Sequence, residues 1–418
     1  MDYYNFSNIQ KVSVLTNGCP ENRIDSARVR DFFIKNGLES VNNFKDADLI
    51  LFNACALTHY NEVRSLAIID QLKAHKRLNA GLIVFGCLAN INKDRLREVY
   101  PGPTFGSDDI DKLDQIFNYK IKTKNVHSNY LIPLTTLNKY KWFLSSCKEN
   151  GVSVTLTKLL TAGFWAKKIK AVHCYNPKTF CIKISTGCLS ACSFCGVKLS
   201  RGPVKSKSIE QVNSEFDEGL RNGFNEFALI GTDIGAYGRD RGSNLAHLLS
   251  KLLEKDGDYK IKLRNINPKF LITMLPEFCE IFKTGKIPYL ISAAQSGSNR
   301  ILKLMKRGYN IQDFKSAIVL LKTEFPNIQI RTQIMVGFPG ETEDDFHDSM
   351  QLLDDVKFDF VEVYMYQPRP GTVASKMENQ IPEKVARRRY QKLFNKAIFR
   401  EYTRNGNFSL DKSRHSHT

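Results

Sequence analysis

The sequence lacks several features that would place it in common classes. It contains no uninterrupted apolar run of the roughly 20 residues that a membrane-spanning helix needs, so no membrane association is expected. Its first residues, Met1–Tyr4, form no basic segment ahead of an apolar stretch, which predicts no secretory signal and a cytoplasmic location. The eight histidines show no metal-ligand spacing, and there is no internal repeat. These absences predict a soluble intracellular protein whose functional residues are not histidines.

Acidic residues are few relative to basic ones. The 418 residues include 61 Lys and Arg against 43 Asp and Glu, which gives a formal net charge of +18. This balance favours a polyanionic partner, nucleic acid first, although a generally lysine-rich surface gives the same composition. The length predicts two or three domains, and the hydrophobic content of 42% is sufficient for their cores.

The most informative of the ten cysteines are Cys188, Cys192 and Cys195. Reducing surroundings keep thiols free, so cysteines here are expected to be metal ligands rather than disulfides. The C-x3-C-x2-C spacing is the one used by radical S-adenosylmethionine enzymes. Three thiolates hold three irons of a 4Fe–4S cluster and leave the fourth iron open to another molecule. The alternative is a structural zinc site, but zinc needs a fourth ligand, and none is obvious near Cys195.

Residues 1–122 are expected to form an N-terminal doubly wound parallel sheet, because strand and helix patterns alternate. A cysteine follows each of three strand candidates: Cys19, Cys55 and Cys87. Open α/β sheets bind ligands at this carboxyl edge, so the three thiols form a candidate second iron–sulfur site. Buried structural cysteine is the alternative. The expected strands span 11–16, 47–53 and 80–85, and the expected helices span 22–36 and 62–76.

The rest of the chain is expected to contain a connector, a second domain and a tail. Residues 123–176 form the connector, with an amphipathic helix over 155–173 that packs between domains or contacts substrate or a membrane surface. Residues 177–400 resume the alternation and predict a partial (β/α)6 barrel with its active site at the strand carboxyl ends. Residues 401–418 are expected to be a disordered tail. The six strand candidates are 180–185, 226–230, 261–264, 289–292, 329–336 and 360–366, and helices are expected over 208–222, 312–325 and 383–403.

Polar residues follow the second barrel strand at Gly231, Thr232 and Asp233. A carboxylate and backbone groups at this position suit the methionine ammonium of S-adenosylmethionine, and a helix N-cap is the alternative role for Asp233. Arg201 lies just beyond the cysteine loop and Arg369 just beyond the last strand. Either arginine is a candidate to meet an anionic group, with a surface ion pair as the alternative.

Two further segments are candidates for S-adenosylmethionine contacts. Gly337, Gly340 and Glu341 follow the fifth strand, where small residues allow the backbone to approach adenosine, although a plain tight turn gives the same pattern. Gln295 and Ser296 follow the fourth strand and supply polar groups suited to a ribose or a carboxylate. The cysteines outside both sets are interpreted as structural or incidental: Cys147, Cys174, Cys181 and Cys279.

Together these segments resemble the radical S-adenosylmethionine methylthiotransferases, over roughly residues 10–395. Two segments, Gly235–Asp240 and Lys306-Arg307-Gly308-Tyr309, most resemble the branch that modifies threonylcarbamoyladenosine beside the tRNA anticodon. The motifs that carry the resemblance are Thr16-Asn17-Gly18-Cys19-Pro20-Glu21-Asn22, Asn53-Ala54-Cys55, Gly86-Cys87, Thr186-Gly187-Cys188 through Cys195, Gln295-Ser296-Gly297-Ser298 and Val336-Gly337-Phe338-Pro339-Gly340-Glu341-Thr342.

The resemblance implies two 4Fe–4S clusters, one on each three-cysteine set. The barrel cluster would cleave S-adenosylmethionine, and the auxiliary cluster would carry sulfur on its open iron. One S-adenosylmethionine would methylate that sulfur and a second would generate a radical on the substrate, so that C–H becomes C–SCH3. The reaction also requires a reducing electron donor such as flavodoxin or ferredoxin. The expected substrate is a tRNA adenosine next to the anticodon.

Three departures from the family pattern concern the substrate. The usual C-terminal small β-barrel (TRAM) domain is not expected, because the chain ends about where it would begin. Gln333 stands where relatives usually have an aspartate, and Ala293-Ala294 stands where a pair with proline is common. The alternative substrate is therefore a peptide or protein, either a natural-product precursor or a ribosomal protein. A third interpretation is an iron–sulfur or RNA-binding protein without catalysis.

Overall fold

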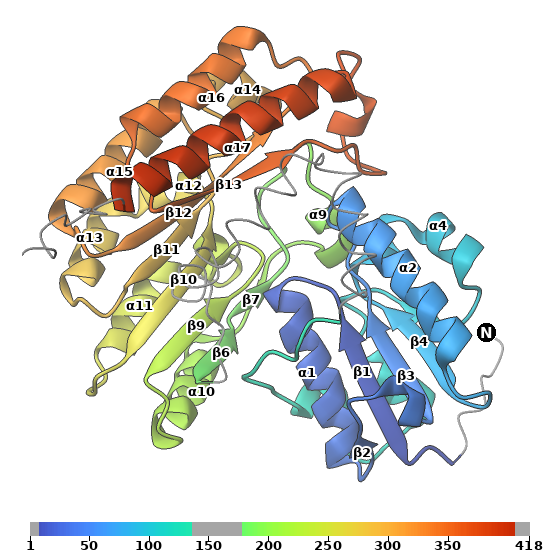
Figure 1. The fold of residues 1–418 in the computed structure, drawn as a ribbon. Coiled ribbons are helices and arrows are strands. Elements are labelled where there is room, and N and C mark those ends of the chain that lie inside the picture. Colours follow the sequence, from blue (N-terminus) through green and yellow to red (C-terminus); the bar gives the residue numbers. More distant parts are fainter. Residues whose placement is uncertain (1–7, 136–177, 406–418) are drawn as a thin grey trace, which may run out of the picture.

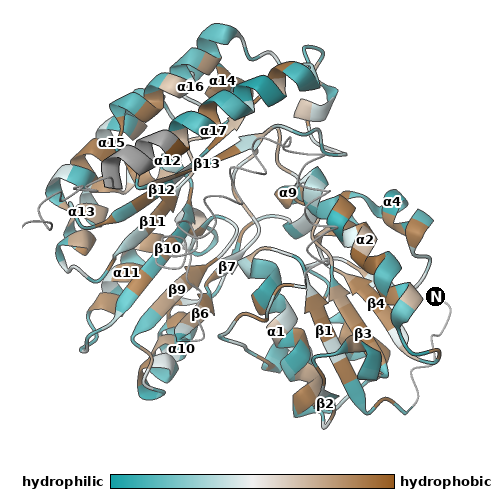
Figure 2. Ribbon diagram, in the orientation of Figure 1, coloured by the Kyte–Doolittle hydropathy of each residue, from teal (hydrophilic) through white to brown (hydrophobic). Residues whose placement is uncertain are grey.

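The computed structural model describes residues 8–135 and 178–405, in which two parallel β-sheets lie side by side (Figure 1). Helices cover the sheets, and hydrophobic residues are concentrated on the strands (Figure 2). The expected α/β class, with an N-terminal parallel sheet followed by a partial barrel, is confirmed. The helix expected over 155–173 lies outside the described residues. No helix among the residues described combines the length and apolar character that crossing a membrane requires.

The N-terminal sheet has five strands in the order β2-β1-β3-β4-β5, and every pair is parallel. The strands are Lys11–Thr16 (β1), Glu39–Ser40 (β2), Leu49–Asn53 (β3), Gly81–Phe85 (β4) and Thr104–Phe105 (β5). The helices are Pro20–Lys35 (α1), His59–His75 (α2), Cys87–Ile91 (α3), Lys93–Val99 (α4) and Lys112–Phe117 (α5), with short 3₁₀ turns at Phe44–Asp46 and Thr123–Asn125.

This sheet forms because its central strands are apolar on both faces. All five residues of β3 are buried, as expected for a parallel strand with helices on both sides. Phe32 and Phe33 of α1 pack on one face, and Ile68 and Ile69 of α2 pack on the other. The carboxyl ends of β1, β3 and β4 therefore meet at one rim of the sheet.

The second sheet has six parallel strands that pair in chain order from β6 to β13. They are Thr179–Lys183 (β6), Glu226–Ile230 (β9), Lys260–Ile266 (β10), Tyr289–Ser292 (β11), Gln329–Val336 (β12) and Phe360–Met365 (β13). The helices are Val197–Arg201 (α9), Ile209–Arg221 (α10), Leu245–Leu253 (α11), Pro268–Thr273 (α12), Leu275–Lys283 (α13), Asn299–Leu304 (α14), Ile311–Glu324 (α15), Glu343–Asp355 (α16) and Glu383–Asn405 (α17), with 3₁₀ turns at Ile234–Ala236 (η3), Arg239–Arg241 and Ala374–Lys376.

The structure contains short elements that the sequence did not predict. Besides β2 and β5, a two-strand antiparallel ribbon pairs Ser185–Thr186 (β7) with Lys205–Ser206 (β8). The barrel cysteines lie on the chain that joins these two strands. In addition, the helix expected over 383–403 runs to Asn405 (α17), so the disordered tail expected from residue 401 does not begin before residue 406. The remainder of that expected tail, 406–418, lies outside the described residues.

The two sheets contact each other through α1. Ile24 of α1 forms an apolar cluster with Cys181 of β6 and with Ala228 and Ile230 of β9. Cys181 is 1% exposed, which fits the structural role expected for it. Beside this cluster, the first turn of α1 buries polar side chains, including Glu21, against the barrel.

Candidate active site

The three barrel cysteines lie on a loop that its backbone holds in place. The amide of Cys188 donates to the carbonyl of Gly202 at 3.2 Å, and the amide of Cys195 donates to the carbonyl of Cys192 at 3.2 Å. Gly187 has φ +74°, and a Cβ there would lie 2.0 Å from the carbonyl oxygen of Pro203. Only glycine fits this position, because both the backbone angle and the space exclude a side chain.

A buried arginine faces this loop. Arg307 is 7% exposed and donates from Nη1 to the Cys192 Sγ at 3.3 Å and from Nη2 to the Ala293 carbonyl at 2.8 Å. Burial raises the pKa of the Cys188 thiol to about 11 and that of Cys195 to about 12. Thiolates at these positions therefore need positive charge, which a bound metal and Arg307 would supply. The sequence named Arg307 only as part of a branch motif, not as a site residue.

The three N-terminal cysteines follow β1, β3 and β4 at the same rim. Cys19 precedes the first residue of α1, and Cys87 is the first residue of α3. The Asn22 Oδ1 lies 3.7 Å from the Cys19 Sγ and 3.6 Å from the Cys87 Sγ. Burial, and then the charges of Cys87 and Cys19, raise the pKa of the Cys55 thiol. The structure thus brings together three thiols that are distant in sequence.

Neither cysteine set has the compact arrangement of a mononuclear metal site. Within 8–135 and 178–405, no three His, Cys, Asp or Glu side chains converge as ligands of a single metal ion. The assignment of both sets to clusters therefore stays a prediction that depends on motif and placement.

Asp233 follows β9, and its two carboxylate oxygens have different surroundings. Its Oδ1 accepts hydrogen bonds from the amides of Gly235 at 3.2 Å and Asn267 at 3.1 Å, so the capping role that was the alternative is present. Its Oδ2 is buried and has no hydrogen-bond partner among the described residues. An unpaired buried carboxylate oxygen is costly unless a ligand satisfies it. This oxygen is therefore available to a cationic group.

The neighbours of Asp233 have roles within the protein. The Thr232 hydroxyl donates to Glu21 Oε2 at 2.9 Å, so it is already engaged with α1. A Cβ at Gly231 would lie 2.7 Å from the Ser185 Oγ, which explains glycine there.

Burial determines the protonation of Asp233 and gives a pH-dependent prediction. Desolvation raises the pKa of this carboxyl to about 6, whereas an unfolded aspartate has a pKa of about 3.9. The folded protein therefore loses stability as pH rises through this interval. Without S-adenosylmethionine, Asp233→Asn should stabilise the protein, and the gain should grow by about 1.4 kcal/mol between pH 5 and pH 8. Urea unfolding of wild type and Asp233→Asn at pH 5 and pH 8 measures this gain. An equal gain at both pH values would contradict a raised pKa for Asp233.

Gln295 has an unusual backbone conformation, with φ +71°. Its amide donates to the Gln333 carbonyl at 2.8 Å, and its carbonyl accepts from the Met335 amide at 2.8 Å. These bonds hold a non-glycine residue in the left-handed region, where strain often marks function. The side-chain Oε1 is buried without a hydrogen-bond partner in the described part of the chain. Like Asp233, Gln295 therefore offers an unsatisfied polar atom at the strand ends.

The other predicted contacts are placed at the same end of the barrel. Gly337 has φ +76° and Gly340 has φ +81°, so both adopt angles that favour glycine. The Glu341 carboxylate accepts from the Gly337 amide at 2.7 Å and from Arg389 Nη1 at 2.9 Å, which shows that it orders this turn. Ser296 is fully buried, with its hydroxyl 3.4 Å from that of Ser349.

The two candidate anion-binding arginines are both buried. Arg201 is 2% exposed and forms ion pairs with Glu21 and Asp25 at 3.0 Å. Arg369 is 4% exposed and forms an ion pair with Glu62 of α2. The alternative of a surface ion pair is therefore wrong for both. Arg201 instead connects α9 of the barrel to α1, and Arg369 connects the chain after β13 to α2.

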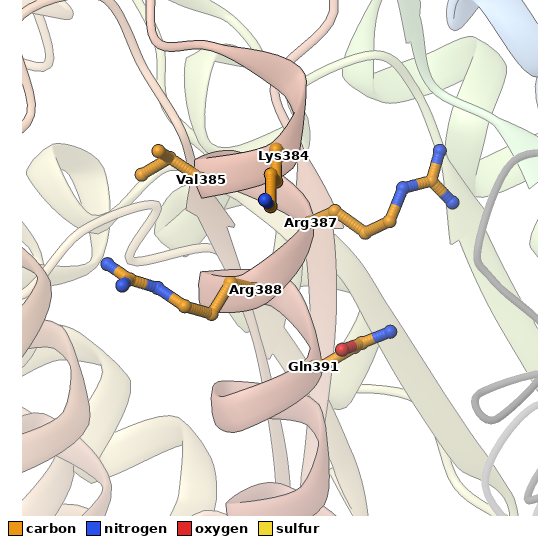
Figure 3. A pocket seen from close by; sticks show the side chains of 5 residues that line it. All are labelled: Lys384, Val385, Arg387, Arg388 and Gln391. Carbon is orange, nitrogen blue, oxygen red and sulfur yellow. The ribbon is translucent and has the colours of Figure 1, made fainter.

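A surface hollow of about 370 Å³ lies on the first turns of α17, and no cysteine lines it. In Figure 3, Arg387 and Gln391 extend to one side of the helix and Arg388 extends to the other. Ion pairs with Glu383 and Glu343 partly neutralise Arg387 and Arg388. The residues that line the hollow are Lys384, Val385, Arg387, Arg388 and Gln391.

Two family models match the chain: the radical SAM superfamily over residues 182–353, and an uncharacterized protein family, UPF0004, over residues 11–105. A threonylcarbamoyladenosine tRNA methylthiotransferase from Thermotoga maritima is 30% identical over 392 residues, which cover 93% of this chain and 82% of that protein. The chain belongs to the radical S-adenosylmethionine methylthiotransferase family. The resemblance found in the sequence is thereby confirmed, and the protein is an enzyme.

Other similarities agree with this family. A ribosomal protein uS12 methylthiotransferase from Protochlamydia amoebophila is 28% identical over 392 residues, covering 92% of this chain and 75% of that protein. A solved radical S-adenosylmethionine methyltransferase from Kitasatospora setae has a TM-score of 0.58 at 11% identity, covering 88% of this chain and 75% of that chain. The second similarity is one of fold alone.

Membership of this methylthiotransferase family implies a 4Fe–4S cluster and S-adenosylmethionine, and the residues present fit both. Three thiols share one loop beside the cation of Arg307. The unsatisfied buried oxygens of Asp233 and Gln295 lie at the carboxyl ends of the same sheet, where a ligand with donor groups would satisfy them.

Proposed function

We propose that this methylthiotransferase converts C–H to C–SCH3 on a tRNA adenosine next to the anticodon and uses two 4Fe–4S clusters. The observation that carries the proposal is the presence of two three-cysteine sets, each at the carboxyl ends of parallel strands. The net charge of +18 and the name of the Thermotoga maritima relative support a tRNA substrate. A domain over 1–122 would hold the auxiliary cluster, and a barrel over 177–400 the other.

In this proposal the barrel cluster is held by the C-x3-C-x2-C set and the auxiliary cluster by Cys19, Cys55 and Cys87. When bound, the barrel cluster with S-adenosylmethionine supplies a 5′-deoxyadenosyl radical, and the auxiliary cluster supplies the sulfur. Arg307 orients Cys192 through its 3.3 Å contact. A reduced flavodoxin or ferredoxin is the proposed electron donor.

The chain's own groups would bind S-adenosylmethionine from several strand ends. Asp233 would accept from the methionine ammonium on its unpaired Oδ2. Gln295 would accept from a ribose hydroxyl on its unpaired Oε1, or donate to the carboxylate from its amide nitrogen. The backbone at Gly337 and Gly340 would lie against adenosine, with the turn held by Glu341 and its bond to Arg389. Burial of these groups excludes water, which protects a radical from side reactions.

A peptide or protein substrate is the second candidate. The observation in its favour is the similarity to the ribosomal protein methylthiotransferase of Protochlamydia amoebophila. The two candidates differ in the molecule that gains the methylthio group, so one assay with both substrates distinguishes them.

The test is anaerobic reconstitution followed by iron analysis and turnover. Wild type should bind about eight irons per chain, and a C188A/C192A/C195A variant about four, because each set holds one 4Fe–4S cluster. With reductant, S-adenosylmethionine and tRNA, wild type should yield 5′-deoxyadenosine and a methylthiolated adenosine by mass spectrometry of nucleosides. The triple variant should yield neither. About four irons in wild type and none in the variant would overturn the two-cluster proposal, and methylthiolation of a ribosomal protein alone would overturn the tRNA assignment.

A further inference from the structure

The first two turns of α1 bury polar side chains where a helix normally exposes them. Glu21 is 5% exposed, Asn22 is fully buried and Asp25 is 3% exposed. They lie within six residues of Cys19 and contact barrel residues Arg201 and Thr232. A buried polar face needs partners to offset its desolvation, and here the partners come from the barrel loops.

Glu21 contacts residues on both sides of the barrel site. Its Oε1 accepts from the Thr186 hydroxyl at 3.2 Å, and its Oε2 accepts from the Thr232 hydroxyl at 2.9 Å. Thr186 lies two residues before Cys188, and Thr232 directly precedes Asp233. A single carboxylate on α1 therefore connects to the cysteine loop and to the loop that carries Asp233.

Asn22 contacts the N-terminal thiols and a barrel arginine with the same oxygen. Its Oδ1 lies 3.7 Å from the Cys19 Sγ and 3.6 Å from the Cys87 Sγ, and it accepts from Arg201 Nη2 at 2.6 Å. Its Nδ2 donates to Asn53 Oδ1 at 3.0 Å, which fixes the orientation of the amide. Metal binding removes the thiol protons, so Arg201 then remains as a donor to this oxygen and as a cation beside the thiolates.

Arg201 is the last residue of α9, the helix that follows Cys195. Its guanidinium bonds to Asn22 through Nη2 and to Asp25 Oδ2 through Nη1 at 3.0 Å. Lys183 Nζ lies 2.6 Å from Asp25 Oδ1. Two cations thus balance the carboxylates of Glu21 and Asp25, and removal of Arg201 would leave an excess negative charge next to the N-terminal thiols.

We propose that Arg201 is a positioning residue that holds the auxiliary cysteines at a fixed distance from the barrel cysteines and places a positive charge beside the auxiliary cluster. This inference rests on the proposed function, which assigns a cluster to each cysteine set. The planar guanidinium donates to Asn22 from one nitrogen and to Asp25 from another, an arrangement called the fork below. Two hydrogen bonds from one rigid group fix the relative position of two segments better than a single bond from a flexible side chain.

The charge and the fork of Arg201 have separable consequences. A nearby cation stabilises the more negative, reduced state of a cluster, so its loss should lower the reduction potential. The fork fixes α1 through Asn22 and Asp25, and α1 begins directly after Cys19, so loss of the fork should loosen the cluster. Both consequences concern the auxiliary cluster alone and are measurable without turnover.

The experiment uses full-length chain in the C188A/C192A/C195A background, where only the auxiliary cluster remains. Arg201→Met removes charge and fork, and Arg201→Lys removes the fork only. Arg369→Met is the matched control. Arg369 also forms an ion pair with a buried carboxylate of the N-terminal domain, Glu62 of α2, but it does not contact Asn22. The measurements are the rate of iron loss to a chelator, the reduction potential by electron paramagnetic resonance titration, and folding by circular dichroism.

Arg201→Met should lose iron at least fivefold faster than the parent and shift the reduction equilibrium at least tenfold toward the oxidised cluster, about 59 mV for one electron. Arg201→Lys should lose iron faster with the potential retained. Arg369→Met, although less stable, should keep the parental potential and lose iron more slowly than Arg201→Met. Parental iron loss and potential in Arg201→Met, or equal shifts in Arg369→Met, would overturn the inference. If Arg201→Met does not fold, an unchanged rate in Arg201→Lys overturns it. A parent without iron overturns the two-cluster proposal itself, and this inference with it.

Discussion

Replacing Arg369 by methionine should lower the free energy of unfolding by about 3–5 kcal/mol, because it breaks a buried ion pair at the contact between the two sheets. The side chains of Arg369 and Glu62 are 4% and 6% exposed, so the change leaves a carboxylate buried without its cation. The remaining hydrogen bond to Glu62 Oε1, from Asn92 Nδ2 at 2.8 Å, does not neutralise that charge. Urea unfolding of the purified chain at neutral pH measures the loss.

Two control variants test whether the loss comes from leaving the buried Glu62 carboxylate without its cation. The double variant Glu62→Gln/Arg369→Met removes both charges and should recover part of the loss, because no isolated buried charge remains. Lys396→Met breaks a pair with Asp354 whose side chains are 23% and 46% exposed, and should cost at most about 1 kcal/mol. A similar small loss for Arg369→Met would mean that Glu62 is not effectively buried.

Gly187→Ala should abolish the barrel cluster while leaving the auxiliary cluster in place. The new methyl group would lie 2.0 Å from the Pro203 carbonyl oxygen and 2.9 Å from that of Arg201, at a φ of +74°. Backbone atoms cannot yield as a flexible side chain does, so the loop that carries Cys188 must move. Iron content should fall from about eight to about four per chain, and cleavage of S-adenosylmethionine should be lost.

Gly223→Ala is the matched control for this substitution. Gly223 has a similar φ of +78°, but nothing lies within 4 Å of the position that a Cβ would occupy. The change therefore costs only the backbone strain of about 1–2 kcal/mol, and iron content should stay at the wild-type value. Wild-type iron in Gly187→Ala would show that the loop tolerates a side chain, whereas a loss in Gly223→Ala would point to general destabilisation.

The strands could be predicted closely because most are buried runs of apolar residues. The expected 226–230, 289–292 and 329–336 coincide with β9, β11 and β12, and 11–16 coincides with β1. Two-residue strands such as β7 and β8 carry no such signal, because their pairing depends on where the chain returns rather than on local composition. The ribbon that frames the barrel cysteines was therefore missed.

The site could be predicted only where residues adjoin a strand end. The cysteines and Asp233 follow strands, and the topology of a parallel sheet brings such positions together. Glu21, in contrast, contacts Arg201 and Thr232, which are distant in sequence. No periodicity marks such a pair, so the arginine was expected to meet either a ligand or solvent. Its burial depends on the docking of two sheets, which only the three-dimensional structure defines.

The polar contact between the sheets also bears on how such an enzyme can be divided and recombined. An isolated barrel would expose Lys183, Arg201 and Arg369 without the carboxylates that they bind in the whole chain. An isolated N-terminal sheet would likewise present Glu21 and Glu62 to water in place of their partners. Grafting the N-terminal half of a relative onto this barrel should therefore keep the interface only where carboxylates at the positions of Glu21, Asp25 and Glu62 are carried over.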